Sequence, residues 1–261
     1  MHPFADLPVP AGSVGIHWFG QSSYALKDPA GTLVLIDPYF PAERPAATFI
    51  HATAPLEEAA LRTDAVLLTH DHGDHTCIES VMRIRAAWPA ARYVGPEEST
   101  ARARQAGVPA ESCLTIAAGQ TVPVGTMLVH ALWSKPAAGV PEEGIRPPNV
   151  QHLGYVMEAG GVRVYVTGDL INTFAEHEEL LAPVRRLKPD LGLLTTHPTE
   201  GEFPYFEGSA AMARKLGLKT ASPAHYECFV TRTFDPHEWA RQLVGVAPLI
   251  IPYNQSVVYR P

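Results

Sequence analysis

Short apolar stretches that end in a histidine or an aspartate recur along this chain. Most of them are rich in Val, Ile and Leu, which is typical of strands buried in a sheet. The stretches span residues 32–37, 65–70, 162–169, 191–197 and 220–225. The last one contains Pro223, which restricts backbone pairing within a sheet. The pattern therefore predicts five short strands, each followed directly by an ionisable side chain.

The side chains at the ends of these strands are chemically alike. They are Asp37, His70, Asp169, His197 and His225. The carboxyl ends of parallel strands meet at one edge of a sheet, where ligands of α/β proteins usually bind. We therefore expect these five side chains to converge on one site.

Helical patterns separate the predicted strands. Apolar residues at helical spacing and the usual start and stop residues predict four helices. In the third helix Ser209 is a candidate cap, and in the fourth Asp235 is the candidate N-cap. The predicted helices span residues 77–88, 96–107, 207–217 and 235–245. Residues 13–28 predict a hairpin that turns at Gly20, and no linker divides the chain, so we expect a single α/β domain over residues 1–261.

Composition narrows the class of protein. Of the 261 residues 46% are hydrophobic and 18% are charged, which is enough apolar material for a large core. The net charge of -7 argues against a surface that binds nucleic acid, and it leaves a small anionic substrate open. No signal peptide and no membrane-spanning run is expected, and the three scattered cysteines predict reduced thiols in the cytoplasm. The sequence does not indicate an oligomeric state.

The second predicted strand runs into the densest cluster of ionisable residues in the chain. His70-Asp71-His72-Gly73-Asp74-His75 has the pattern H-x-H-x-D-H, and Gly73 permits a tight turn. Imidazoles suit Zn²⁺, Mn²⁺ or Fe²⁺, and carboxylates add negative charge and can bridge two ions. The alternative is a solvated polar turn that closes a strand. The motif favours a site for one or two divalent metal ions.

This motif resembles the hallmark of the metallo-β-lactamase superfamily, which implies a four-layer αββα sandwich. The resemblance implies that Asp37 supports the metal loop, that Asp169 bridges the ions, and that His225 is the last metal histidine. Three further segments are similar to hydrolases of the L-ascorbate-6-phosphate lactonase type. They are "HWFGQSSYALKDPAGTLVLIDPYF", "HLGYVMEAGGVRVYVTGD" and "SPAHYECFVTRTFDPHEW".

One element departs from the superfamily pattern, in which a further histidine ends a strand before the bridging aspartate. Here the strand "TMLVHALW" is followed by Ser134 and Lys135. His130 shares a strand face with leucines, so we expect a buried core histidine rather than a ligand. His152 is open between a metal or substrate contact and a plain loop role.

The two expected metal positions therefore differ in their ligands. One has His70 and His72 without an evident third histidine. The other has Asp74, His75 and His225, and Asp169 can bridge the two. Both a mononuclear and a dinuclear enzyme remain open.

The resemblance implies a metal-dependent hydrolase in which metal-activated water attacks a lactone, ester or phosphate ester of a small substrate. We expect Asp74 to orient the nucleophile or take its proton, and Asp37 and Asp71 to accept hydrogen bonds from metal-bound histidines. Two alternatives remain: a phosphodiesterase of the same fold, and a non-catalytic metal-binding or sensor protein.

The residues that contact substrate are less well specified. Candidates for hydrogen bonds to an anionic group are His197, Tyr226, Arg146 and Arg232, and solvated surface positions are the alternative for the two arginines. Gln21 either contacts the site or serves only the turn at Gly20. Glu200 and Glu202, in the loop after His197, are either site residues or simply solvated. Cys228 is expected to be a small buried residue.

Overall fold

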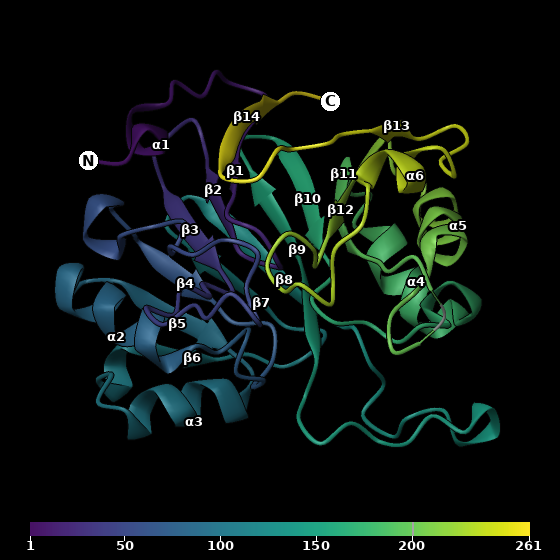
Figure 1. Ribbon diagram of the computed structural model, residues 1–261, viewed down its shortest axis with the longest axis horizontal. Coiled ribbons are helices and arrows are strands. Elements are labelled where there is room, and N and C mark those ends of the chain that lie inside the picture. Colours follow the sequence, from purple (N-terminus) through teal and green to yellow (C-terminus); the bar gives the residue numbers. More distant parts are fainter. Residues whose placement is uncertain (200) are drawn as a thin grey trace.

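Two seven-stranded sheets pack face to face in the computed structural model, which describes residues 1–199 and 201–261. The strand orders are β14-β1-β2-β3-β4-β5-β6 and β13-β12-β11-β10-β9-β8-β7. Helices cover the outer face of each sheet, on opposite sides of the molecule (Figure 1). The predicted four-layer αββα sandwich is confirmed.

The first sheet joins the two ends of the described chain. β14 to β3 pair antiparallel, and β3 to β6 pair parallel. Its strands are β1 (Val14–Trp18), β2 (Tyr24–Lys27), β3 (Leu33–Ile36), β4 (Ala65–Leu67), β5 (Arg92–Gly95), β6 (Cys113–Thr115) and β14 (Gln255–Tyr259). The helical elements on this side are α1 (Pro3–Asp6), η1 (Glu58–Ala60), α2 (Ile78–Ala87), α3 (Glu97–Gln105) and η2 (Ala110–Ser112).

The second sheet repeats the same sequence of pairings. β7 to β10 pair antiparallel, and β10 to β13 pair parallel. Its strands are β7 (Thr121–Val124), β8 (Met127–Trp133), β9 (Leu153–Ala159), β10 (Val162–Val166), β11 (Leu191–Thr195), β12 (Thr220–Ala224) and β13 (Ala247–Pro248). Its helical elements are η3 (Pro141–Glu143), η4 (Phe174–Glu176), α4 (Glu178–Arg186), α5 (Phe206–Leu216) and α6 (Pro236–Ala240).

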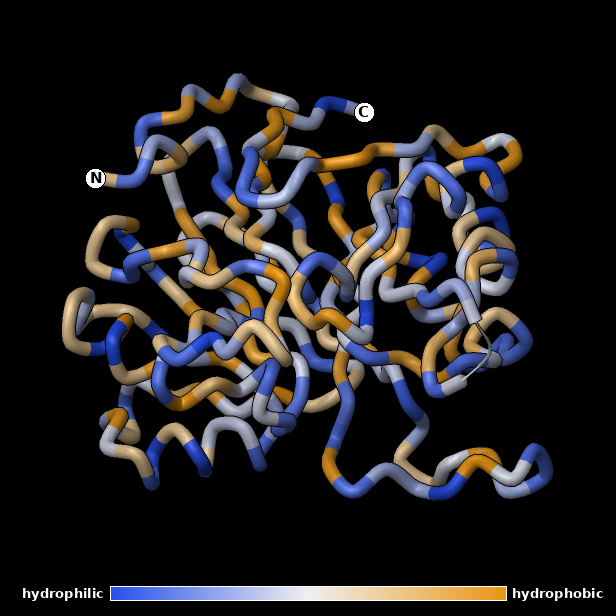
Figure 2. The backbone as a smooth tube through the Cα atoms, in the orientation of Figure 1, coloured by the Kyte–Doolittle hydropathy of each residue, from blue (hydrophilic) through white to orange (hydrophobic). Residues whose placement is uncertain are grey.

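Both faces of the central strands are buried, which explains their continuous apolar runs. In β3, Val34 and Ile36 pack between the two sheets, whereas Leu33 and Leu35 pack beneath the helices. Apolar stretches accordingly run along the strands that cross the middle of the molecule (Figure 2). Burial of one such side chain stabilises the fold by about 1.5–3 kcal/mol. The packing of both faces therefore holds the strand ends, and the loops that follow them, in place.

The predicted strands correspond to β3, β4, β10, β11 and β12, but they do not share one sheet. Two belong to the first sheet and three to the second. This distribution agrees with the two-sheet sandwich that the superfamily resemblance implies. In each half of the chain, antiparallel strands precede the parallel ones.

The predicted hairpin and four helices are present, with two corrections. β1 and β2 pair antiparallel around Gly20, whose φ of 91° requires glycine or a strained residue. Asp235 caps α6 by accepting a hydrogen bond from the backbone N–H of His237 (2.9 Å), but α6 already ends at Ala240. Ser209 is not a cap, because α5 begins at Phe206; its buried hydroxyl instead accepts a hydrogen bond from Trp239 Nε1 (2.7 Å).

Across the described residues, every helix is too short or too polar to cross a membrane. Glu200 lies outside the described residues.

Candidate metal centre

Loops that leave the carboxyl ends of β3, β4, β10 and β12 meet at one edge of the sandwich. They bring together two clusters of side chains whose potential ligand atoms lie within 4.8 Å of one another. The first cluster is His70, His72 and His152, and the second is Asp74, His75 and His225. A third group of the same kind, His70, His75 and Asp169, links the two. Four of the five strand-end residues thus lie in or beside these clusters, since Asp37 contacts His75 and Asp169 lies between the clusters.

Asp169 faces both clusters with different oxygens. Its Oδ2 is 3.7 Å from His70 Nε2, and its Oδ1 is 3.4 Å from His75 Nε2 and from His225 Nε2. Oδ1 is buried and has no hydrogen-bond partner among the described residues. Such a buried acceptor is costly, whereas ligands of a tetrahedral ion at about 2.1 Å lie about 3.4 Å apart. The donor set and the unpartnered oxygen therefore fit divalent metal ions.

A hydrogen-bonded chain under the metal loop orients two of the histidines. Asp37 accepts hydrogen bonds from His75 Nδ1 (2.7 Å), Thr69 N (2.8 Å) and Thr69 Oγ1 (2.6 Å). Since the Thr69 hydroxyl donates to Asp37, it can accept a hydrogen bond from His70 Nδ1 (3.0 Å). These contacts leave the Nε2 atoms of His70 and His75 free to bind a metal. Asp37 is thus hydrogen-bonded to His75 as expected.

Other partners orient the remaining histidines of the first cluster. His152 Nδ1 donates to the backbone oxygen of Asp169 (3.2 Å), which leaves its Nε2 free. His72 Nε2 donates to Asn149 Oδ1 (3.2 Å), which leaves its Nδ1 facing His70 Nε2 at 3.1 Å. The sequence did not indicate Asn149, because nothing local connects a loop residue before β9 to a histidine after β4.

Asp71 does not contact a metal-cluster histidine. Its carboxylate pairs with Arg102 Nη1 in α3 (3.1 Å). His70 and His72 point into the site, and the residue between them points to the opposite side. The expectation for Asp71 is therefore wrong.

Burial keeps several of these imidazoles neutral. It lowers the pKa of His70 well below its usual value, lowers that of His152 to about 3, and lowers that of His225. Burial alone would also lower the pKa of His75, but the carboxylates of Asp169, Asp74 and Asp37 raise it well above its usual value. A metal binds neutral imidazole, so binding at the second cluster should release the His75 proton.

A family model described as "Beta-lactamase superfamily domain" matches residues 32–226, which include every residue of both clusters. The chain belongs to this superfamily. A "UPF0173 metal-dependent hydrolase" of Myxococcus xanthus is 28% identical over 250 residues, covering 92% of this chain and 81% of that protein. A "Probable L-ascorbate-6-phosphate lactonase UlaG" of Salmonella choleraesuis is 26% identical over 200 residues, covering 70% of this chain and 54% of that protein.

A solved structure shares the fold across nearly the whole chain. Igni18, a metallo hydrolase from Ignicoccus hospitalis, superposes with a TM-score of 0.72 at 19% identity, covering 95% of this chain and 98% of that one. That structure supports the fold, whereas the family match and the relatives that match in sequence identify this superfamily member as a metal-dependent hydrolase. The prediction of an enzyme is confirmed at that level, and the alternative of a non-catalytic sensor is set aside.

His152, and not His130, lies where the first cluster needs a third histidine. The imidazole of His130 is half-buried on the outer face of the second sheet, hydrogen-bonded to Thr121 Oγ1 (2.9 Å) and Glu158 Oε1 (3.1 Å). Its neighbour on that face, Leu128, is 42% exposed. The expectation of a core histidine is therefore wrong, because the alternate residues of β8 face the core.

Two candidate substrate residues lie apart from the clusters. Tyr226 is buried between Trp18 and Phe234, with ring centroids 4.5 Å from each, so it belongs to the core. His197 lines a cavity of about 290 Å³ together with Phe203 and Arg232, and the Phe203 ring centroid lies 4.7 Å from that of His225. Cys228 is buried as expected, and burial raises its pKa to about 11, which makes it a poor nucleophile.

A cavity of about 400 Å³ opens directly onto the first cluster. Residues 134–152, the long excursion between β8 and β9 at the bottom of Figure 1, form much of its wall. His72, His152, Lys135, Arg146, Asn149 and Asn172 are among the residues that line it. The metal clusters thus have an adjoining space for a small molecule.

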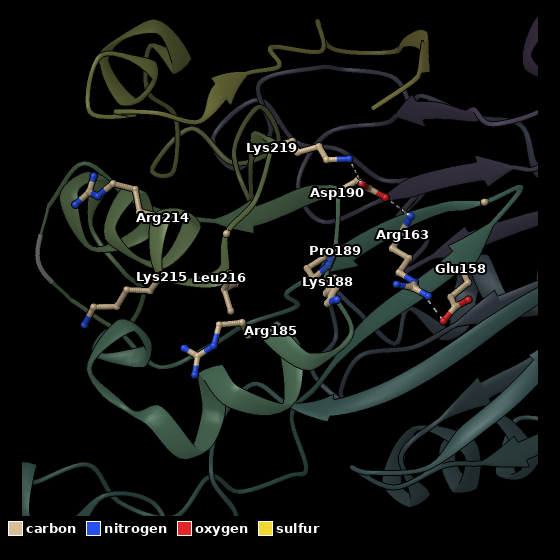
Figure 3. Close-up of a pocket in the computed structure, with 12 residues that line it drawn as sticks. Glu158, Arg163, Arg185, Lys188, Pro189, Asp190, Arg214, Lys215, Leu216 and Lys219 are labelled. Carbon is tan, nitrogen blue, oxygen red and sulfur yellow. Dashed lines mark hydrogen bonds and ion pairs between the residues drawn. The ribbon is translucent and has the colours of Figure 1, made fainter.

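A larger cavity, of about 750 Å³, lies away from this site. It is lined by Asp190 and Lys219, which directly precede β11 and β12, and so lies at the amino ends of these strands. Two of its cations form ion pairs within it: Lys219 Nζ is 2.7 Å from Asp190 Oδ1, and Arg163 Nε is 3.4 Å from Glu158 Oε1 (Figure 3). None of the metal-cluster residues lines it. The smaller cavity beside the clusters is therefore the candidate substrate site.

Proposed function

We propose that this enzyme hydrolyses a small lactone, ester or phosphate ester that carries an anionic group. The observation that carries this proposal is the cavity of about 400 Å³, which joins His72 and His152 to the cations Lys135 and Arg146. Cationic side chains suit phosphate or carboxylate groups, and a cavity of this volume suits a small molecule. The printed name of the Salmonella relative, a probable lactonase of a phosphorylated lactone, supports the same substrate class.

We further propose that each cluster holds one divalent ion, Zn²⁺ or Mn²⁺ or else Fe²⁺, with Asp169 shared between them. The neutral imidazoles and the carboxylates of both clusters support this assignment. When bound, such an ion supplies Lewis acidity and makes water an effective nucleophile at neutral pH.

The protein's own groups would then orient the reactants. The side chain of Asp74 is 29% exposed, whereas that of Asp169 is 6% exposed, so Asp74 is the carboxylate better placed to orient water or accept its proton. Lys135 Nζ pairs with Glu202 Oε1 at 2.9 Å, and the Glu202 side chain is 50% exposed. Exchange of that exposed carboxylate for an anionic group of the substrate would position the substrate beside the first cluster.

We also propose that residues 1–261 act as one domain in the cytoplasm, on a small molecule rather than on a nucleic acid. The free cysteines Cys77, Cys113 and Cys228 support a reducing compartment, and the net charge of -7 disfavours a polyanion.

The test is hydrolysis by metal-stripped protein to which Zn²⁺ or Mn²⁺ is returned. The substrates are matched lactones with and without a phosphate group, and a generic phosphodiester. We expect metal-dependent hydrolysis of lactones, and Lys135→Ala and Arg146→Ala should raise KM for the phosphorylated lactone only. Turnover of the phosphodiester alone would show the alternative phosphodiesterase, and turnover of none would refute this substrate class.

A further inference from the structure

The side chain of Gln21 reaches the middle of the second metal cluster. Its amide nitrogen Nε2 donates to Asp74 Oδ2 (3.0 Å) and lies 3.1 Å from His225 Nε2 and 3.2 Å from His75 Nε2. These are the three atoms that would bind the second ion. The sequence left open whether Gln21 contacts the site, and the structure shows that it does.

The amide is oriented with its nitrogen, not its oxygen, toward the cluster. The backbone N–H of Ser22 donates to Gln21 Oε1, so a reversed amide would turn its NH₂ group toward another donor. A reversed amide would also turn its oxygen toward the carboxylate of Asp74. The hydrogen-bond partners on both sides therefore assign the same orientation.

The backbone holds Gln21 in an unusual conformation at this position. Its φ of 52° is rare for a residue other than glycine. Its backbone N–H donates to the backbone oxygen of Tyr226 (2.7 Å). Its backbone oxygen accepts hydrogen bonds from the backbone N–H of His225 (3.0 Å) and from Trp18 Nε1 (3.0 Å). The side chain is thus supported by the same backbone bridge that carries His225.

An amide NH₂ group and a metal ion compete for the lone pairs of the same ligand atoms. The two amide hydrogens carry partial positive charge and can donate to Asp74 Oδ2 and His225 Nε2, whereas the amide nitrogen has no lone pair available to bind a cation. An ion can therefore reach Asp74, His75 and His225 only when the Gln21 nitrogen leaves. Among the described residues, no side-chain amide lies between the ligand atoms of His70, His72 and His152. Asn149 contacts His72 at Nε2, the ring nitrogen that points away from His70.

We propose that Gln21 is an internal competitor for the second metal position, which makes the Asp74, His75 and His225 cluster the weaker of the two. The first ion then binds at His70, His72 and His152, and the second binds only when the Gln21 side chain withdraws. This inference rests on the two metal positions of the proposed function.

The test is a titration of metal-stripped protein with Co²⁺, followed by visible absorption, which needs no substrate. A His72→Ala background removes a ligand of the first cluster and isolates the second. In that background Gln21→Asn and Gln21→Ala should bind Co²⁺ about tenfold more tightly, as expected for one hydrogen bond that no longer has to be broken. Asn tolerates the left-handed backbone and is one methylene shorter, so it keeps the fold without reaching the cluster.

Ser22→Ala is the matched control, because the Ser22 hydroxyl has no hydrogen-bond partner among the described residues while its backbone N–H is retained. Its Co²⁺ affinity should not change, and thermal unfolding should show that every variant is folded. Weaker binding in both Gln21 variants would make Gln21 a ligand instead, and unchanged binding would remove it from the metal site; either result overturns the inference. If the metal-stripped wild-type protein does not bind Co²⁺, the metal positions of the proposed function are refuted instead.

Discussion

Asp37→Asn should disable the second metal cluster without a change in side-chain volume. Asp37 is fully buried and accepts three hydrogen bonds, one from His75 Nδ1 and two from Thr69. An asparagine has only one oxygen to offer and places an NH₂ group in the other position. If that oxygen keeps the bond from the Thr69 N–H, the NH₂ group faces His75 Nδ1. His75 must then carry its proton on Nε2, the atom that faces the cluster.

The expected loss follows from these contacts. Loss of a partner that fixes the tautomer of a metal-bound histidine typically lowers metal affinity by about 10–100-fold. Hydrogen bonds to a charged group contribute about 1.5–3 kcal/mol each, and the substituted amide retains at least one of the three. We therefore expect the free energy of unfolding of the metal-free protein to fall by about 1.5–3 kcal/mol if one of these bonds is lost, and by about 3–6 kcal/mol if two are lost.

Calorimetric titration with Zn²⁺ and ¹⁵N chemical shifts of the His75 ring measure the two effects separately. The matched control is Asp71→Asn, since Asp71 pairs with Arg102, whose side chain is 41% exposed. Such a pair contributes at most about 1 kcal/mol, so this variant should bind Zn²⁺ normally. Wild-type Zn²⁺ affinity in Asp37→Asn, with the His75 proton still on Nδ1, would refute the reasoning.

Three further predictions concern stability. Burial lowers the pKa of His17 to about 4, so the unfolded chain binds more protons below pH 6.5 and stability falls as the pH drops from 6.5 toward 4. His17→Gln should therefore lose about 2 kcal/mol less than wild type between pH 7 and pH 5 in urea unfolding, and an equal loss would contradict this. Zn²⁺ at 100 times its Kd should stabilise the protein by about 2.7 kcal/mol per independent ion, and a chelator should reverse the gain. If neither Zn²⁺ nor the chelator changes the midpoint of thermal unfolding, Zn²⁺ does not bind the folded state. Leu67→Ala, at a fully buried position between the sheets, should cost about 2–5 kcal/mol, whereas Leu128→Ala on the outer face should cost less than about 0.5 kcal/mol; similar losses would show that the core is misplaced.

Local patterns accounted for much of the fold. Apolar runs marked β3, β4, β10, β11 and β12 because both faces of these strands are buried. Cap residues are less decisive: Asp235 does cap α6, but Ser209 lies inside α5. A serine in the first turn of a helix resembles a cap in sequence, and only its burial against Trp239 distinguishes the two roles.

Local sequence patterns did not show which residues lie in the core and which lie in the site. Tyr226 follows a cluster histidine directly, yet its ring packs in the core because the backbone turns at His225, whose φ is 70°. His130 lies on a strand with leucines on the same face, yet that face is the partly exposed one. Alternation along a strand shows which residues share a face, and only packing shows which face is inside.

The sequence by itself determined the metal loop, since His70, His72, Asp74 and His75 lie within six residues and their spacing restricts where they can point. It also determined that strand ends would supply Asp37, Asp169 and His225 nearby. Tertiary structure alone decided that His152 completes the first cluster, that Asn149 orients His72, and that the Gln21 amide lies among the atoms of the second. These three residues come from loops whose paths depend on how the two sheets pack, and no local pattern encodes a contact between segments so far apart.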